Sequence, residues 1–167
     1  KPAANTTRTG VVGVLATTQT LQSESVARLC LEHGEGKRIL LQACPGWVEA
    51  VEEADLHSPQ TEALLRQFVV PLMDQGVDTL VLGCTHYPLL TGVISYVMGN
   101  NVSLVSSAEE TAKDLYRILV ESDSLRTDNS TPATHRFLAT GDAAAFETLA
   151  RRFLGPEVGR VEHQSLT

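Results

Sequence analysis

Short apolar runs rich in β-branched residues alternate with helix-like segments along this chain, and this alternation constrains the fold more than any other feature. The runs occupy residues 9–17, 38–43, 77–83 and 101–106, and segments with helical spacing or helix-capping residues lie between them. Apolar runs without polar alternation are typical of parallel strands that are covered on both faces. The sequence therefore predicts an α/β fold, with a mostly parallel sheet flanked by helices.

Two of the intervening segments carry helix boundary signals. Ser58 fits the N-cap of a helix over 58–76, inside which Pro71 should cause a kink or a break. Ser107 and Glu110 have the spacing of a capping box at the start of a further helix. These signals support the helical half of the predicted alternation.

A thiol and an imidazole follow one of the predicted strands directly. Cys84 and His86 come after the 77–83 run, and a helix is predicted to begin just beyond them. In open parallel sheets, ligands bind at the carboxyl ends of strands, where Thr17, Thr20 and Cys44 also fall. A cysteine beside a histidine and a helix start can exchange protons near neutral pH. The alternative is an inert buried cysteine, but the Gly-Cys-Thr-His-Tyr context favours a functional one.

Three other features have simpler interpretations. A zinc site is disfavoured because neither Cys44 nor Cys84 belongs to a Cys-x-x-Cys pair. Cys44 is followed by a proline, which has no amide donor, so we interpret it as structural, and Trp47 as core. Glu52 lies in an acidic run, a pattern that is usually a solvated face.

Composition excludes several classes of protein. The 167 residues are 43% hydrophobic and 20% charged, which is typical of globular domains. A net charge of −7 with scattered basic residues argues against a nucleic-acid partner. No stretch is long and apolar enough to span a bilayer, so no membrane partner is expected. Three widely spaced cysteines do not form a disulfide framework, which favours a cytoplasmic location.

Four stretches resemble those of bacterial glutamate racemases, and they are spread so widely that the resemblance extends over essentially the whole chain. Residues 81–90, Val-Leu-Gly-Cys-Thr-His-Tyr-Pro-Leu-Leu, are similar to the second cysteine motif of that family and are the most specific of the four. Residues 1–23 resemble its Lys-Pro-Ala-Ala and Gly-Val-Leu-Ala-Thr segments, and 42–53 its Ala-Cys-Pro segment. Residues 137–164 resemble its Thr-Gly-Asp segment and closing strand.

This resemblance implies a cofactor-independent proton transfer at the α-carbon of glutamate, which supplies D-glutamate for peptidoglycan. In that family two cysteines flank the substrate, one removing the α-proton while the other delivers a proton to the opposite face. By the family pattern, Cys84 is the second cysteine, His86 its assisting histidine, and Glu52 the acid that assists His86. The positions that match substrate-contacting or nearby residues are Thr17, Thr20 and Thr85.

The family's N-terminal motifs, Asp-Ser-Gly-x-Gly-Gly and the Cys-Asn-Thr that bears the first cysteine, are missing from this sequence. The chain is therefore expected to be a truncated racemase that is inactive alone. In that family the chain leaves the first of two pseudo-symmetric α/β domains, builds the second and then returns to the first. Residues 1–106 would be the complete second domain. Residues 107–167 would be the returning part of the first domain. The returning part should expose apolar edges that the missing N-terminal segment, or a second copy in a homodimer, would cover.

Two alternatives remain open from the sequence. One is another amino-acid or hydantoin racemase of the same superfamily, although Thr-His-Tyr-Pro after the cysteine favours glutamate. The other is a non-catalytic chain that binds a partner, which the missing first cysteine supports.

Overall fold

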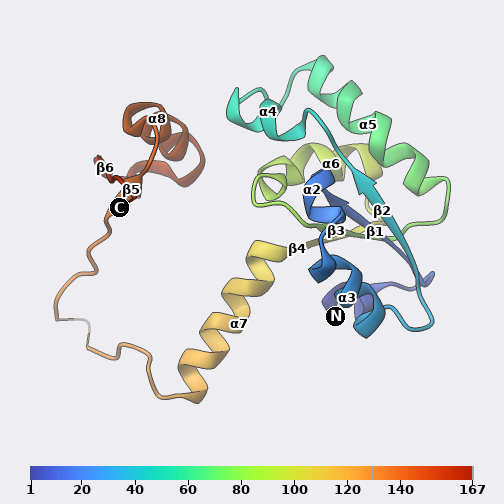
Figure 1. Cartoon of the computed structure of the whole chain (residues 1–167), viewed down its shortest axis with the longest axis horizontal. Helices are drawn as coiled ribbons and strands as arrows, with labels where there is room; N and C mark the ends of the chain where they lie inside the picture. The colour runs from blue at the N-terminus through green and yellow to red at the C-terminus, as the bar shows by residue number, and fades with distance from the viewer. Residues whose placement is uncertain (129, 167) are drawn as a thin grey trace. The chain divides into compact units, whose positions relative to one another are not determined.

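The computed structural model describes residues 1–128 and 130–166 (Figure 1). The chain divides into two compact units, Lys1–Glu121 and Ser122–Thr167, and each is described by itself. No helix among the described residues combines the length and apolar character needed to cross a membrane.

The first unit is built on a four-stranded, wholly parallel sheet. Its strands are β1 (Val11–Ala16), β2 (Arg38–Ala43), β3 (Thr79–Leu82) and β4 (Ser103–Ser106). They are ordered β2-β1-β3-β4, with Val14 of β1 opposite Leu41 of β2 and Val81 of β3. Because all four strands run the same way, their carboxyl ends meet at one edge, which confirms the predicted α/β class.

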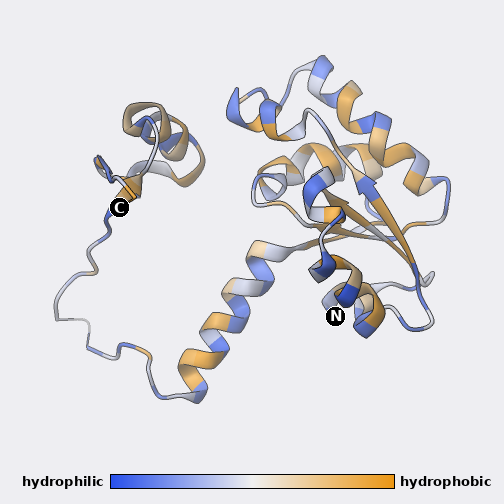
Figure 2. Ribbon diagram, in the orientation of Figure 1, coloured by the Kyte–Doolittle hydropathy of each residue, from blue (hydrophilic) through white to orange (hydrophobic). Residues whose placement is uncertain are grey.

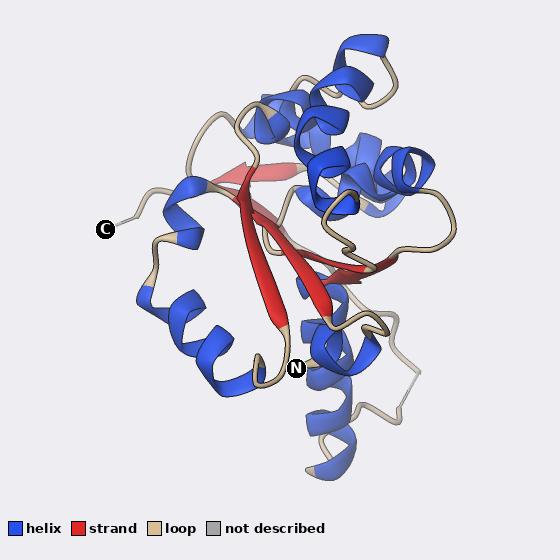
Figure 3. Cartoon of the chain, turned by 90° about the vertical axis from the view of Figure 1, so that its right-hand side faces the viewer, coloured by secondary structure: helices blue, strands red, loops and turns tan. Residues whose placement is uncertain are grey.

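Helices cover both faces of this sheet. The elements are α1 (Pro2–Thr6), α2 (Thr18–Leu21), α3 (Glu24–His33), α4 (Trp47–Glu52), α5 (Pro59–Met73), the 3-10 turn η1 (Tyr87–Leu90), α6 (Thr91–Met98) and α7 (Ser107–Glu121). Helices α4, α5 and α6 lie on one side and α1 and α3 on the other (Figures 1 and 3). The core of this unit includes Leu80 and Leu82 of β3, Leu65 of α5 and Ile94 of α6, all of which are fully buried.

Helix α5 is continuous, so of the kink or break predicted at Pro71 the break is wrong. Ser58 caps the helix by accepting a hydrogen bond from the Thr61 amide at 3.1 Å, as expected. The helix then continues through Pro71 to Met73. A proline in the last turn removes only one late backbone bond, while the buried stripe that includes Leu72 holds the helix on the sheet.

The capping box predicted at the start of α7 is also wrong, by one residue. The Ser106 hydroxyl accepts the Glu109 amide at 3.3 Å, which is the cap interaction. Ser107 instead donates its hydroxyl to the Leu82 carbonyl oxygen at 2.9 Å. Ser107, which local spacing predicts as the cap, therefore binds β3 instead, and Ser106 caps the helix.

Asp78 forms a buried polar centre that sequence reasoning did not single out. Its carboxylate accepts the Thr7 and Thr79 hydroxyls at 2.6 and 3.1 Å, and the Arg8 and Thr9 amides at 2.7 and 2.9 Å. Burial alone raises the pKa of Asp78, but these hydrogen bonds outweigh it and leave the pKa well below its usual range. The carboxylate thus fixes the segment that enters β1 to the start of β3.

In the part of the second unit that the structure describes, there is one parallel strand pair and one α-helix. Strands β5 (Phe137–Ala139) and β6 (Val161–His163) are joined through α8 (Ala143–Leu154) and the 3-10 turn η2 (Gly155–Glu157). Its buried cluster consists only of Ala150, Val158 and Val161, with Phe137, Ala139 and Ala143 packed against it. A parallel pair normally needs cover on both faces, so this unit has a small core for its fold.

Exposed apolar side chains are concentrated on α7 and in the second unit. Helix α7 has no buried residue, and it exposes Leu115 at 57% and Tyr116 at 63%. Hydrophobic and hydrophilic residues alternate along its ribbon in Figure 2. In the second unit Leu138, Phe146 and Leu154 are 47%, 46% and 59% exposed. Exposed apolar side chains that are grouped in this way are typical of surfaces that a partner, a ligand or a membrane covers.

Candidate active site

The loop after β3 places Cys84 at the carboxyl edge of the sheet. The amide of Gly83 donates to the Leu15 carbonyl oxygen at 2.8 Å, which ties the loop to β1. A Cβ atom at Gly83 would lie only 3.2 Å from the Leu15 carbonyl oxygen, so a side chain there would crowd the strand. Cys84 is partly exposed, and η1 follows at Tyr87 and runs directly into α6.

His86 lies between two polar groups. Its Nε2 is 3.4 Å from Oε1 of Glu52, and its Nδ1 is 3.3 Å from the Thr85 hydroxyl. The His86 and Glu52 side chains are 33% and 57% exposed, so their attraction is worth about 0.2–1 kcal/mol at most. Glu52 is the last residue of α4, and the fold brings it to His86 across 34 positions of sequence.

Cys44 occupies a different environment from Cys84. Its side chain is 2% exposed, and its Sγ contacts the Gln42 carbonyl oxygen at 3.6 Å. Burial, and to a smaller extent the neighbouring Cys84, raises the pKa of the Cys44 thiol to about 12. Cys44 is therefore a neutral thiol at physiological pH, which agrees with a structural role.

The threonines after β1 form a short capping arrangement at the same edge of the sheet. The Thr17 and Thr20 hydroxyls are 2.8 Å apart, and the Thr20 amide donates to the Thr17 hydroxyl at 3.3 Å. Thr17 is thus the N-cap of α2, while both hydroxyls keep further capacity for hydrogen bonding. The register pairs Ala16 with Ala43 and Leu15 with Leu82, so the ends of β1, β2 and β3 are level.

Tyr87 is a further residue of this region that sequence reasoning passed over. Its side chain is fully buried, and its hydroxyl donates to the Cys44 carbonyl oxygen at 3.1 Å. Its ring meets Trp47 edge-on at 5.0 Å between centroids. Burial raises the pKa of Tyr87, as do the nearby Cys44 and Cys84, so its hydroxyl stays a donor. The only feature of the sequence that could have pointed to Tyr87 was its position directly after His86.

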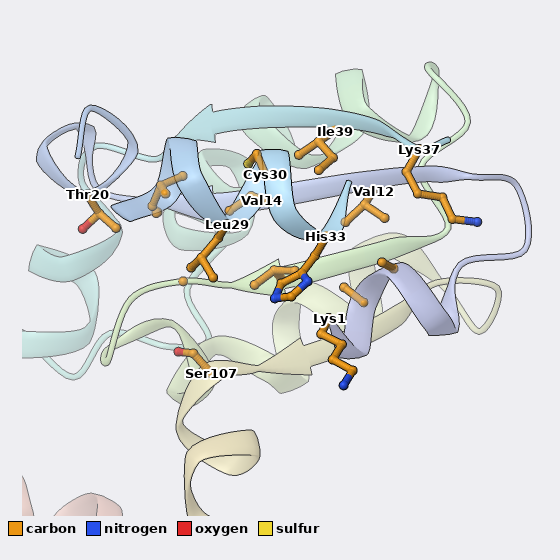
Figure 4. Close-up of a pocket in the computed structure, with 16 residues that line it drawn as sticks. Lys1, Val12, Val14, Thr20, Leu29, Cys30, His33, Lys37, Ile39 and Ser107 are labelled. Atoms are coloured by element: carbon orange, nitrogen blue, oxygen red, sulfur yellow. The ribbon is translucent and has the colours of Figure 1, made fainter. Parts of the chain in front are cut away.

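A cavity of about 300 Å³ lies elsewhere in the first unit (Figure 4). Apolar side chains of β1, α3 and β2 line most of it, among them Val12, Leu29 and Ile39, and Thr20 lies at one end. Its lining does not include Cys84, Thr85 or His86. Among the described residues, no group of three or more His, Cys, Asp or Glu side chains is placed to hold a metal ion.

The thiol, the imidazole and the carboxylate beside this parallel sheet all lie in a segment that matches a family of racemases. Residues 2–115 match the Asp/Glu/hydantoin racemase family, and the chain belongs to it. The chain is 52% identical to a glutamate racemase of Beutenbergia cavernae over 167 residues, and 48% identical to one of Mycobacterium ulcerans over 160 residues. These alignments cover 95% and 96% of this chain but 57% and 59% of the relatives, so it spans little more than half of their length.

Solved structures give the same result. The chain superposes on a glutamate racemase isoform of Bacillus anthracis, RacE1, with a TM-score of 0.85 at 33% identity, covering 99% of this chain and 60% of that one. It superposes on a glutamate racemase of Francisella tularensis, solved in complex with D-glutamate, with a TM-score of 0.83 at 26% identity. That match covers 98% of this chain and 61% of the other.

Proposed function

We propose that this chain carries the Cys84 half of a glutamate racemase active site, which interconverts L- and D-glutamate and supplies D-glutamate for peptidoglycan in the cytoplasm. The observation that carries the proposal is the position of Cys84, partly exposed at the carboxyl edge of the sheet and next to a His86–Glu52 pair. Identities near 50% to glutamate racemases support glutamate as the substrate.

The proposed reaction moves one proton at each face of the α-carbon. In one direction the Cys84 thiolate removes the α-proton, and a second thiol delivers a proton to the opposite face. In the other direction Cys84 delivers the proton. His86, oriented by Glu52, assists the thiol on this side, and no cofactor takes part. Thr17, Thr20 and Thr85 supply hydroxyls that bind the carboxylate or amino group of glutamate.

The second thiol lies outside this chain in our proposal. Cys44 is buried with a raised pKa, and Cys30 lies on α3 and lines the apolar cavity, whose lining does not include Cys84. We therefore assign the second face of the substrate to neither of them. We assign residues 1–106 to the complete second domain and 107–167 to the returning part of the first. The exposed apolar residues of α7, such as Leu115, are the surface that the rest of the first domain would cover.

Circular dichroism of L- or D-glutamate over time tests this proposal. The 167-residue chain alone should not racemise glutamate, because one proton donor returns the proton to the face it left. Joining or adding the segment that its relatives carry beyond it should give turnover. In that complete enzyme Cys84→Ala should abolish turnover, while Cys30→Ser should keep it.

His86→Asn provides the finer test in the complete enzyme. It should slow one direction of racemisation more than the other, because His86 serves only one of the two thiols. Equal loss in both directions would contradict the assisting role. Robust racemisation by the 167 residues alone would show that Cys30 or Cys44 acts on the second face.

A second candidate is a related racemase with another substrate, since the matched family also contains aspartate and hydantoin racemases. Assaying aspartate and a substituted hydantoin with the complete enzyme separates these substrates. If no substrate turns over, the remaining candidate is a non-catalytic chain that binds a partner.

A further inference from the structure

Tyr87 connects the loop that bears Cys84 and His86 to the turn before α4, the helix that ends at Glu52. Its hydroxyl donates to the Cys44 carbonyl oxygen at 3.1 Å. The same carbonyl accepts the Trp47 amide at 3.4 Å, in the turn that begins α4. Since Tyr87 directly follows His86 in the chain, this contact ties the His86 loop to the first turn of α4.

Helix α4 transmits this contact to the carboxylate. Trp47 is its first residue and Glu52 its last, a separation of about 7.5 Å along the helix axis at 1.5 Å per residue. Two contacts therefore join α4 to the His86–Tyr87 segment, one at each end of the helix. Trp47 meets Tyr87 at 5.0 Å between ring centroids, and Glu52 meets His86 at 3.4 Å.

The buried contact is the stronger of the two. Exposed ion pairs contribute little, and both His86 and Glu52 are substantially exposed. Tyr87 and Trp47 are fully buried, and an aromatic side chain of this kind removes about 150–250 Å² from water. The Tyr87 hydroxyl bond to the Cys44 carbonyl holds the ring in this packing against Trp47. The bond and the packing together therefore determine where α4 lies, and the His86–Glu52 distance follows from them.

We propose that Tyr87 is a positioning residue that holds the His86 imidazole against the Glu52 carboxylate. It does not touch the reacting atoms. With Nε2 directed at the carboxylate, that nitrogen carries the proton, and Nδ1 accepts from the Thr85 hydroxyl at 3.3 Å. The ring is thereby kept in one tautomer, with the orientation that its proposed role requires. This inference rests on the function proposed above for His86 and Glu52.

A double-mutant comparison by NMR tests the proposal on the 167-residue chain. The ring nitrogen shifts of His86 are recorded at about pH 9, where histidine side chains are neutral. Glu52→Gln should move these shifts in the otherwise unchanged chain. In a Tyr87→Phe background the same change should move them by less than half as much. Tyr96→Phe, which removes a tyrosine hydroxyl at a 72% exposed site, is the matched control and should leave the response to Glu52→Gln unchanged.

The possible results are distinguishable. An undiminished response to Glu52→Gln in the Tyr87→Phe background overturns the positioning role alone. No response in the otherwise unchanged chain means that His86 and Glu52 are not coupled, which overturns both the assisting pair and this inference. If Tyr87→Phe does not fold, Trp47→Phe keeps the hydroxyl bond, weakens the ring contact, and carries the same comparison.

Discussion

Replacing Asp78 by asparagine should destabilise the first unit more than its modest change in size would imply. Oδ2 of the carboxylate accepts the Arg8 and Thr9 amides, and Oδ1 accepts the Thr7 and Thr79 hydroxyls. An asparagine can keep its oxygen on the two amides, but its NH2 group then faces two hydroxyls that must reverse. The change therefore weakens two bonds and disrupts two more.

The size of the effect follows from these four bonds. A hydrogen bond to a charged group is worth about 1.5–3 kcal/mol and a neutral one about 0.5–1.5 kcal/mol, so losing the charge costs about 1 kcal/mol for each amide bond. The reversed hydroxyl bonds add about 1 kcal/mol together, giving a total of roughly 3 kcal/mol. For a unit of this size, that loss lowers Tm by roughly 10 °C.

Fluorescence of Trp47 during thermal unfolding measures this directly, because it is the single tryptophan of the sequence and is buried in the same unit. Asp74→Asn, at an exposed position nearby, is the control for loss of one negative charge. If Asp78→Asn lowers Tm no more than Asp74→Asn does, the hydrogen-bonded carboxylate is not a main stabilising feature.

The same carboxylate predicts a pH dependence. The pKa of Asp78 is lowered in the folded state, so its stabilisation is complete above the unfolded value of about 3.9. It is lost as the pH falls from there through the lower folded value. The Tm difference between the unchanged chain and Asp78→Asn should therefore be full at pH 7 and shrink below about pH 4.

Two further predictions concern the core and the thiols. Gly13→Ala should cost about 1–3 kcal/mol in chemical denaturation, because the new Cβ would lie 2.5 Å from a methyl group of the fully buried Leu80. Gly92→Ala meets nothing within 4 Å and should not destabilise; equal losses for both would contradict the packing argument. Iodoacetamide at pH 8 should modify Cys84 well before Cys44, whose thiol is buried with a pKa of about 12, and peptide mass spectrometry would reveal the reverse order.

The sequence by itself determined the positions of the strands and the class of fold. β-Branched apolar runs predict buried parallel strands wherever they occur, and the β2 run at 38–43 matches the observed strand residue for residue. It also determined that Cys84 and His86 lie at a strand end, because two residues apart in one loop are close in any fold. The same local argument places Thr17 and Thr20 at a strand end, because they directly follow the apolar run of β1.

The tertiary structure alone decided which distant groups meet. Glu52 belongs to an acidic run that looks solvated, and it reaches His86 only because α4 packs beside η1. Likewise, Ser106 and not Ser107 caps α7 because the Ser107 hydroxyl binds a carbonyl oxygen of β3. Asp78 gave no signal because three of its four partners, Thr7, Arg8 and Thr9, lie far away in the sequence, in the segment that enters β1. Periodicity and spacing describe the chain over a few residues, whereas these contacts depend on how complete elements pack against one another.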